Sequence, residues 1–149
     1  MVSVNFLGRI PACLKDLPIR RSLAASYRSA GWSGSAEVSV VFVSEPEMKR
    51  LNRERRGVDR STDVLSFAYR ELDRKERRLS DEGGLGDIIV CPGRVRRQAS
   101  EIGRSCDQEL ALVIVHGFLH LLGFDHDTPS REKKMFFLQH EALLRAKIL

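Results

Sequence analysis

The segment HGFLHLLGFDH, residues 116–126, decides how this chain is organised. His116 and His120 are four residues apart, so their side chains lie on one face of a helix. Gly123 favours the left-handed conformation that ends a helix, so His126 can return to the first two histidines. Two histidines at this spacing also arise by chance, but the third histidine and the glycine favour convergence on one point. The pattern predicts a metal site with zinc as the leading candidate, because three nitrogen ligands leave one tetrahedral position for water.

Length and composition predict one soluble globular domain covering residues 1–149. Hydrophobic residues make up 42% of the chain and charged residues 30%. The formal charge of +5 suits a polyanionic partner such as RNA, but it is common in proteins without one. The most apolar stretch, residues 110–122, is interrupted by His116 and His120, so we expect a buried helix and no membrane span. Three cysteines without a CxxC pair or a signal peptide favour a cytoplasmic location.

The hydrophobic pattern predicts strands mixed with helices along the chain. Strands are expected at residues 2–7, 37–43, 63–69 and 85–91, and a charged loop or hairpin at residues 72–84. Helices are expected at residues 20–30, 44–57, 94–102, 105–122 and 128–144. Two of them begin with capping boxes, Ser44 with Glu47 and Ser105 with Gln108. This mixture predicts an α+β fold, in which about five helices pack on a single mixed sheet of about four strands and a central buried helix carries the metal motif.

A metal ion would also explain why a buried helix carries two histidines, because an unpaired buried polar group costs on the order of a few kcal/mol. Asp125 and Asp127 flank His126, where they either orient a ligand imidazole or form the turn after the helix. The histidine spacing also occurs in a metalloprotease signature, in which a glutamate follows the first histidine and acts as general base. Gly117 stands at that position and cannot transfer a proton. The metal site is therefore retained while a peptidase mechanism is disfavoured.

The segment 116–126 resembles the signature of the YbeY family, bacterial rRNA maturation factors that are also called metal-dependent endoribonucleases. Two further blocks are similar to the family's sequence and occur in the family's order. One consists of Leu51, Asn52 and Arg56 followed by STDVLSF at residues 61–67, and the other is LGDIIVCP at residues 85–92. The resemblance therefore extends over much of residues 40–126.

This resemblance implies a cytoplasmic, zinc-dependent, single-strand-specific endoribonuclease, which would act on the 3′ end of 16S rRNA and in ribosome quality control. It implies one Zn²⁺ bound by His116, His120 and His126, and a catalytic role for Arg56. The implied partners are single-stranded RNA or rRNA, the ribosomal subunit and its associated ribosomal proteins, with no membrane and no DNA. Two departures concern the arginine block, because Arg55 stands where the family often has an aromatic residue and Ser61 replaces a frequent proline.

The basic residues near these blocks are candidates for contacting an RNA backbone. A guanidinium suits phosphate oxygens, which fits the role of Arg56 that the resemblance implies, although the sequence alone favours a solvated arginine on a helix. The other candidates, each equally open to that reading, are Arg53, Arg55, Arg60, Arg94, Arg96 and Arg97. Ser66 and Asp87 lie near strand ends close to the expected site, and their roles stay open.

Two alternatives to the endoribonuclease stay open at this point. One is a zinc hydrolase of another substrate, which would take its proton-transfer group from elsewhere in the chain. The other is a non-catalytic ribosome-assembly or RNA-binding factor, in which zinc only holds the fold together.

Overall fold

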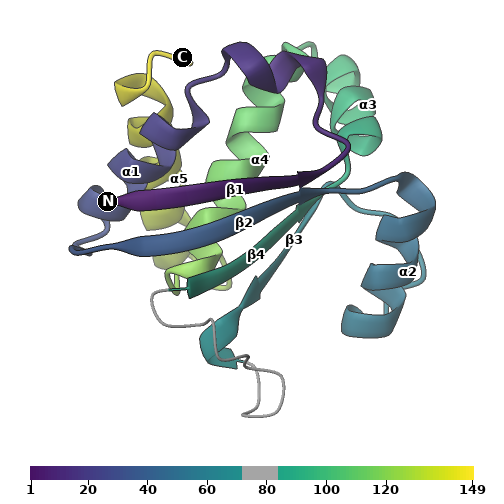
Figure 1. Cartoon of the computed structure of the whole chain (residues 1–149), viewed down its shortest axis with the longest axis horizontal. Coiled ribbons are helices and arrows are strands. Elements are labelled where there is room, and N and C mark those ends of the chain that lie inside the picture. Colours follow the sequence, from purple (N-terminus) through teal and green to yellow (C-terminus); the bar gives the residue numbers. More distant parts are fainter. Residues whose placement is uncertain (72–83) are drawn as a thin grey trace.

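The computed structural model describes residues 1–71 and 84–149 of the chain. Within these residues, four strands form one mixed sheet in the order β1-β2-β4-β3 (Figure 1). The parallel strands are β1 (Val2–Gly8), β2 (Ala36–Phe42) and β4 (Gly84–Val90), and β3 (Val64–Ala68) runs antiparallel to β4 at the sheet edge. The charged loop expected at residues 72–84 lies outside the described residues except for Gly84, which begins β4.

Helices cover the two faces of this sheet unequally (Figure 1). The helices are α1 (Ile19–Ser29), α2 (Glu45–Arg56), α3 (Pro92–Ile102), α4 (Cys106–Leu121) and α5 (Pro129–Arg145), with short 3-10 turns at Ala12–Asp16 and Tyr69–Glu71. Helices α1, α4 and α5 pack together over one face, and α3 packs against α4. On the opposite face, Met48 of α2 joins Leu65 and Ile89 in a smaller apolar cluster. The predicted α+β fold is confirmed.

Helix α4 is the centre of the core, as its apolar sequence predicts. Ile114 and Phe118 are fully buried between the sheet and the neighbouring helices. At its start the Ser105 hydroxyl accepts a hydrogen bond from the Gln108 backbone N–H at 3.1 Å, but the Gln108 side chain donates to the Ile148 carbonyl at 3.2 Å. The expected capping box is therefore only half formed. In the described part of the chain, no helix combines the length and hydropathy that crossing a membrane requires.

Helix α2 begins and ends as its sequence predicts, and its end brings a basic segment to the edge of the sheet. The Ser44 hydroxyl caps the Glu47 backbone N–H, the Glu47 carboxylate accepts from the Ser44 backbone, and both halves of the capping box are present. Gly57 ends the helix in the left-handed conformation with φ 71°. The following loop is held by the Asn52 amide, which donates to the Arg60 carbonyl at 2.9 Å. Arg56 is thereby placed beside β3.

Candidate metal centre

The three histidines of the central motif converge at the end of α4. His116 and His120 lie one above the other on the last turns of the helix, and Gly123, at φ 101°, turns the chain so that His126 returns to them. Their ring centroids are 4.7, 5.4 and 5.6 Å apart, and one ligand nitrogen from each lies within 4.8 Å of the other two. Among the residues that the structure describes, this is the one cluster of histidine, cysteine or carboxylate side chains with such spacing.

The distances between the histidine nitrogens suit a small tetrahedral metal ion. Nε2 of His116 and Nε2 of His120 are 3.1 Å apart. Two nitrogens bound to one tetrahedral zinc at about 2.0–2.1 Å lie roughly 3.3–3.4 Å from each other. All three donors are imidazoles, which are common ligands for zinc and other transition metals. The residues present therefore fit a metal ion, and three protein ligands would leave one tetrahedral position for water or substrate.

Gln139 of α5 orients the first histidine of the cluster. Its side chain is buried, and its Oε1 accepts a hydrogen bond from His116 Nδ1–H at 2.5 Å. Because the amide oxygen can only accept, this bond places the imidazole proton on Nδ1 and leaves the Nε2 lone pair directed at the other histidines. Gln139 was not among the residues predicted from the sequence. The available signal was a polar residue within the apolar inner stripe formed by Met135, Leu138 and Ala142.

The histidine surroundings favour neutral imidazoles. Burial lowers the pKa of His116 below its ordinary value, against the opposing effect of the hydrogen bond with Gln139. Burial lowers the pKa of His120 as well, and the adjacent His116 adds to that shift. A neutral imidazole is the form that binds a metal, so both shifts favour binding near neutral pH.

The two aspartates beside His126 stabilise the turn after α4. Their hydrogen bonds go to the backbone and to Arg131, and not to an imidazole. Asp125 Oδ1 accepts from the His126 backbone N–H at 2.7 Å, and this bond lowers the pKa of Asp125. Asp127 pairs with Arg131 of α5 at 3.2 Å. Of the two roles that the sequence left open, the structure favours the turn.

Arg56 and the histidines line the same cleft, which has a volume of about 810 Å³. The Arg56 guanidinium donates to the Ser66 carbonyl at 2.9 Å and lies over the Phe67 ring, 5.6 Å from its centroid. Arg60 also lines the cleft. The sequence-predicted residues Arg56, His116, His120 and His126 are thus brought together across β3 from the ends of α2 and α4.

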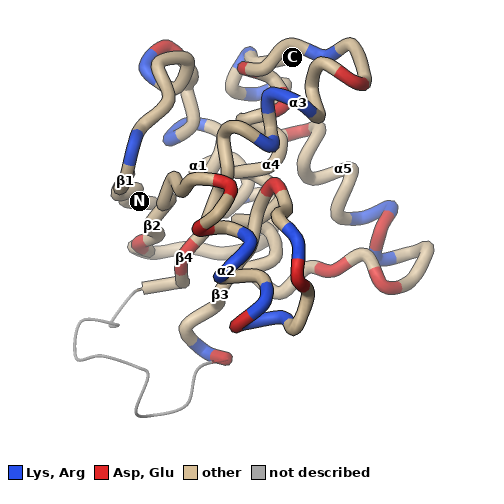
Figure 2. The backbone as a smooth tube through the Cα atoms, turned by 90° about the vertical axis from the view of Figure 1, so that its right-hand side faces the viewer, with Lys and Arg blue, Asp and Glu red and all other residues tan. Residues whose placement is uncertain are grey.

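The other predicted arginines contribute less directly to the cleft. Charges of both signs occur along α2, as Figure 2 shows. Arg53 pairs with Asp59 at 3.7 Å, and Arg97 of α3 pairs with Glu45 at 2.7 Å. Arg55 lies over the Phe67 ring at 5.9 Å. None of Arg53, Arg55 and Arg97 is among the described residues that line the cleft.

Gly117 lies where helix α4 comes closest to the sheet. A Cβ at this position would be 2.9 Å from both Ile88 Cγ2 and Ser66 Oγ. The Ser66 hydroxyl also donates to the Gly117 carbonyl at 3.0 Å, which ties β3 to the helix. A side chain at residue 117 would therefore point into the sheet, so the glycine is required by packing and no carboxylate fits there.

Ser66 and Asp87 have different positions relative to the cleft. Ser66 lines the cleft beside the histidine helix, whereas Asp87 does not. Asp87 pairs with Phe67 in the sheet register and accepts a hydrogen bond from the Tyr69 hydroxyl at 2.7 Å. Since side chains alternate along a strand and Ile88 faces Gly117, Asp87 faces away from α4.

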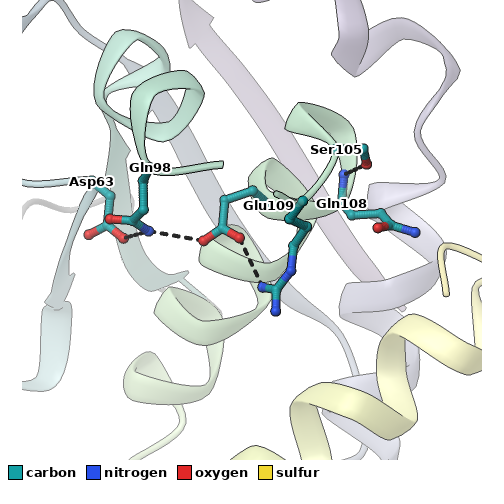
Figure 3. A network of polar contacts seen from close by, with 6 residues as sticks. Asp63, Gln98, Ser105, Gln108 and Glu109 are labelled. Carbon is teal, nitrogen blue, oxygen red and sulfur yellow. Dashed lines mark hydrogen bonds and ion pairs between the residues drawn. The ribbon is translucent and has the colours of Figure 1, made fainter. Parts of the chain in front are cut away.

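A polar network includes Asp63, Gln98 and Glu109, which all line the cleft, and Figure 3 shows its hydrogen bonds. The Gln98 amide donates to Asp63 Oδ2 at 3.0 Å and to Glu109 Oε1 at 2.9 Å, and Arg104 donates to Glu109 Oε2 at 2.9 Å. Glu109 lies on α4 two turns before His116 and is only 3% exposed. A buried carboxylate needs partners for its charge, and Arg104 and Gln98 provide them. The network was not predicted, and it fixes α3, α4 and the start of β3 around the cleft.

The mixed sheet, the buried histidine helix and the arginine-lined cleft define an α+β protein with a candidate metal site. The family model described as Endoribonuclease YbeY matches residues 15–147, and the chain belongs to this family. Proteins named Endoribonuclease YbeY from Halalkalibacterium halodurans and Shouchella clausii are both 48% identical to it, over 80% and 95% of this chain and 77% and 92% of their own. The solution structure of TM1509 from Thermotoga maritima is 32% identical, with a TM-score of 0.65 over 96% of this chain and 88% of that one.

Proposed function

We propose that the cleft binds one zinc ion through His116, His120 and His126 and cuts single-stranded RNA at this site. As a member of the endoribonuclease YbeY family, the chain is an endoribonuclease that hydrolyses RNA phosphodiester bonds. The observation that carries the proposal is the convergence of three imidazoles within 4.8 Å at the wall of a cleft that also contains Arg56.

Arg56 is proposed to hold a phosphate of the substrate next to the histidines. When bound, a zinc ion would supply Lewis acidity towards a phosphoryl oxygen and lower the pKa of its water. A guanidinium has five N–H donors, so the single bond to the Ser66 carbonyl leaves donors for phosphate oxygens. The Phe67 ring beneath the guanidinium limits its movement, so the positive charge is positioned before the substrate arrives.

The biological substrate is proposed to be rRNA, with the 3′ end of 16S rRNA as the processing site and a part in ribosome quality control. In this proposal the 149 residues act as one domain, in the cytoplasm, in contact with the ribosomal subunit and its proteins. The excess of basic residues, formally +5, supports association with a polyanion. A peptidase is disfavoured because Gly117 contacts the sheet and leaves no room for a glutamate.

The test is cleavage of a single-stranded RNA by the protein with known metal content. His116→Ala or removal of metal by a chelator should abolish cleavage, and Arg56→Ala should lower the rate on the order of 100-fold or more with zinc content unchanged. A peptide substrate assayed in parallel should remain intact. Full cleavage by protein that elemental analysis shows to be metal-free would contradict the proposal. Unchanged rRNA processing in cells carrying Arg56→Ala would favour the non-catalytic assembly factor.

A further inference from the structure

Phe136 of α5 is an aromatic side chain exposed on the wall of the catalytic cleft. Phe136 is 47% exposed as a residue, whereas the preceding residue, Met135, is fully buried in the core. The described lining of the cleft includes Phe136 together with the histidines and with polar residues such as Arg56. A large apolar side chain left exposed in a polar cleft contributes little to the core, and such positions are typical of binding surfaces.

Phe136 lies about one helical turn from Gln139, the residue of α5 that contacts the histidine cluster. Gln139, three residues after Phe136, accepts the hydrogen bond from His116. Residues three apart on a helix are neighbours, with about 5–6 Å between their Cβ atoms. Phe136 is therefore adjacent to the part of α5 that contacts the metal-binding face of α4.

A second hollow adjoins the cleft and shares lining residues with it, Phe136 among them. It has a volume of about 350 Å³ and shares Phe136, Gln139 and Leu112 with the larger cleft. Arg104 and His140 also line this hollow, so an RNA strand that passes Phe136 would meet basic and polar side chains there as well. The volume is at the lower end of the range of small-ligand sites, roughly 300–1,000 Å³.

We propose that Phe136 stacks against a nucleobase of single-stranded RNA, next to the phosphate held at the histidine cluster. The inference rests on the proposed endoribonuclease site and assigns a position to a base beside it. Charge supports this occupant, because Arg56 and Arg60 line the cleft for phosphates while the exposed ring offers a π-face for a base. A paired base in a duplex has both faces covered, so the ring also provides a physical reason for single-strand specificity.

The experiment compares Phe136→Ala with Phe137→Ala in the zinc-loaded protein. Phe137 is the matched control, because it is 60% exposed and is not among the described residues lining the cleft. Stacking of one base is worth a factor of about 5 to 150, so Phe136→Ala should lower kcat/KM for single-stranded RNA by that factor. Phe136→Trp should keep most of the activity, and Phe137→Ala should match the wild type.

Substrates with a single abasic nucleotide, moved along the RNA, then show which base is involved. At one position near the cleavage site, loss of the base should slow the wild type but not slow Phe136→Ala further, because both changes remove the same contact. Unchanged kcat/KM in Phe136→Ala would overturn the proposal. So would abasic and Phe136→Ala effects that are fully additive at every position of the RNA. Phe136 would then be better explained as a contact for another protein than for a base. If Phe136→Ala contains as much zinc as the wild type, its loss of activity does not come from a disturbed contact between Gln139 and His116.

The failure of this proposal can be separated from failure of the proposed function. If the wild type cleaves RNA and Phe136→Ala cleaves it equally well, the stacking proposal alone is wrong. If the zinc-loaded wild type cleaves no RNA, both are wrong.

Discussion

Gln139 is the residue that determines which nitrogen of His116 faces the other two histidines. The side chain comes from α5, while the histidine belongs to α4, so the contact depends on how the two helices pack. Partners of this kind hold a ligand imidazole in one tautomer and orientation, and their loss typically costs 10- to 100-fold in metal affinity. At the scale of single residues, we therefore expect metal binding to depend on more than the three histidines.

Gln139→Ala should weaken zinc binding about 10- to 100-fold, because the Nδ1–H of His116 loses its acceptor. Gln139→Glu keeps an oxygen acceptor at this place and should retain most of the affinity. Competition with a chromophoric chelator measures both constants. Gln108→Ala is the control, since its side chain bonds to the Ile148 carbonyl and not to a histidine. Wild-type affinity in Gln139→Ala would rule out this role.

The sequence predicted the site residues whose partners are close in the chain, and it missed those whose partners are distant. The histidines converge within eleven residues, by helical spacing and one glycine turn, so a local pattern was sufficient. The contacts of Gln139 and Glu109 come from other elements, and a polar residue on an inner helical face does not reveal its partner. Placing Arg56 beside the cleft needed the family resemblance, because only the packing of α2 on the sheet brings it there.

At the scale of elements, the contact of α4 with β3 and β4 sets the distance between the histidine helix and the sheet. The close approach at Gly117 places the helix against Ser66 and Ile88. The boundaries of the elements were predicted more accurately than the contacts between elements, because boundaries depend on local sequence. Capping residues and glycines mark ends locally, as in α2, whereas the Gln108 side chain was misassigned because its acceptor is at residue 148.

Gly117→Ala should destabilise the protein by about 1–3 kcal/mol, because the new Cβ would lie 2.9 Å from Ile88 Cγ2 and Ser66 Oγ. The better helix propensity of alanine, up to about 1 kcal/mol, offsets part of this. Gly93→Ala is the matched control in α3, where the nearest atom to the new Cβ is Glu45 Cγ at 3.7 Å, so stability should be equal or higher. Urea unfolding compares the two, and equal stability of both variants would show that the packing at residue 117 is not restrictive.

At the scale of the whole molecule, the fold places the three imidazoles of the histidine cluster where helix α4 meets the edge of the sheet. The end of α2 lies at one side of β3 and the end of α4 lies at the other, so the cleft forms around this edge strand of the sheet (Figure 1). Folding partly buries His116 and His120, which lowers the pKa of each. Global stability, metal binding and pH are therefore linked.

The metal-free protein should lose stability as the pH falls below about 6.5, the ordinary pKa of histidine in an unfolded chain. In that range the unfolded chain takes up protons that His116 and His120, with lowered pKa values, do not take up while folded. Urea unfolding between pH 7.5 and about 5 measures this, above the main titration range of carboxylates. Replacing both histidines with glutamine should flatten the dependence. Zinc should stabilise the wild type most at the upper end of this pH range, because at lower pH protons compete with the metal for the imidazoles. A metal-free wild type with the same pH dependence as the double variant would contradict this linkage.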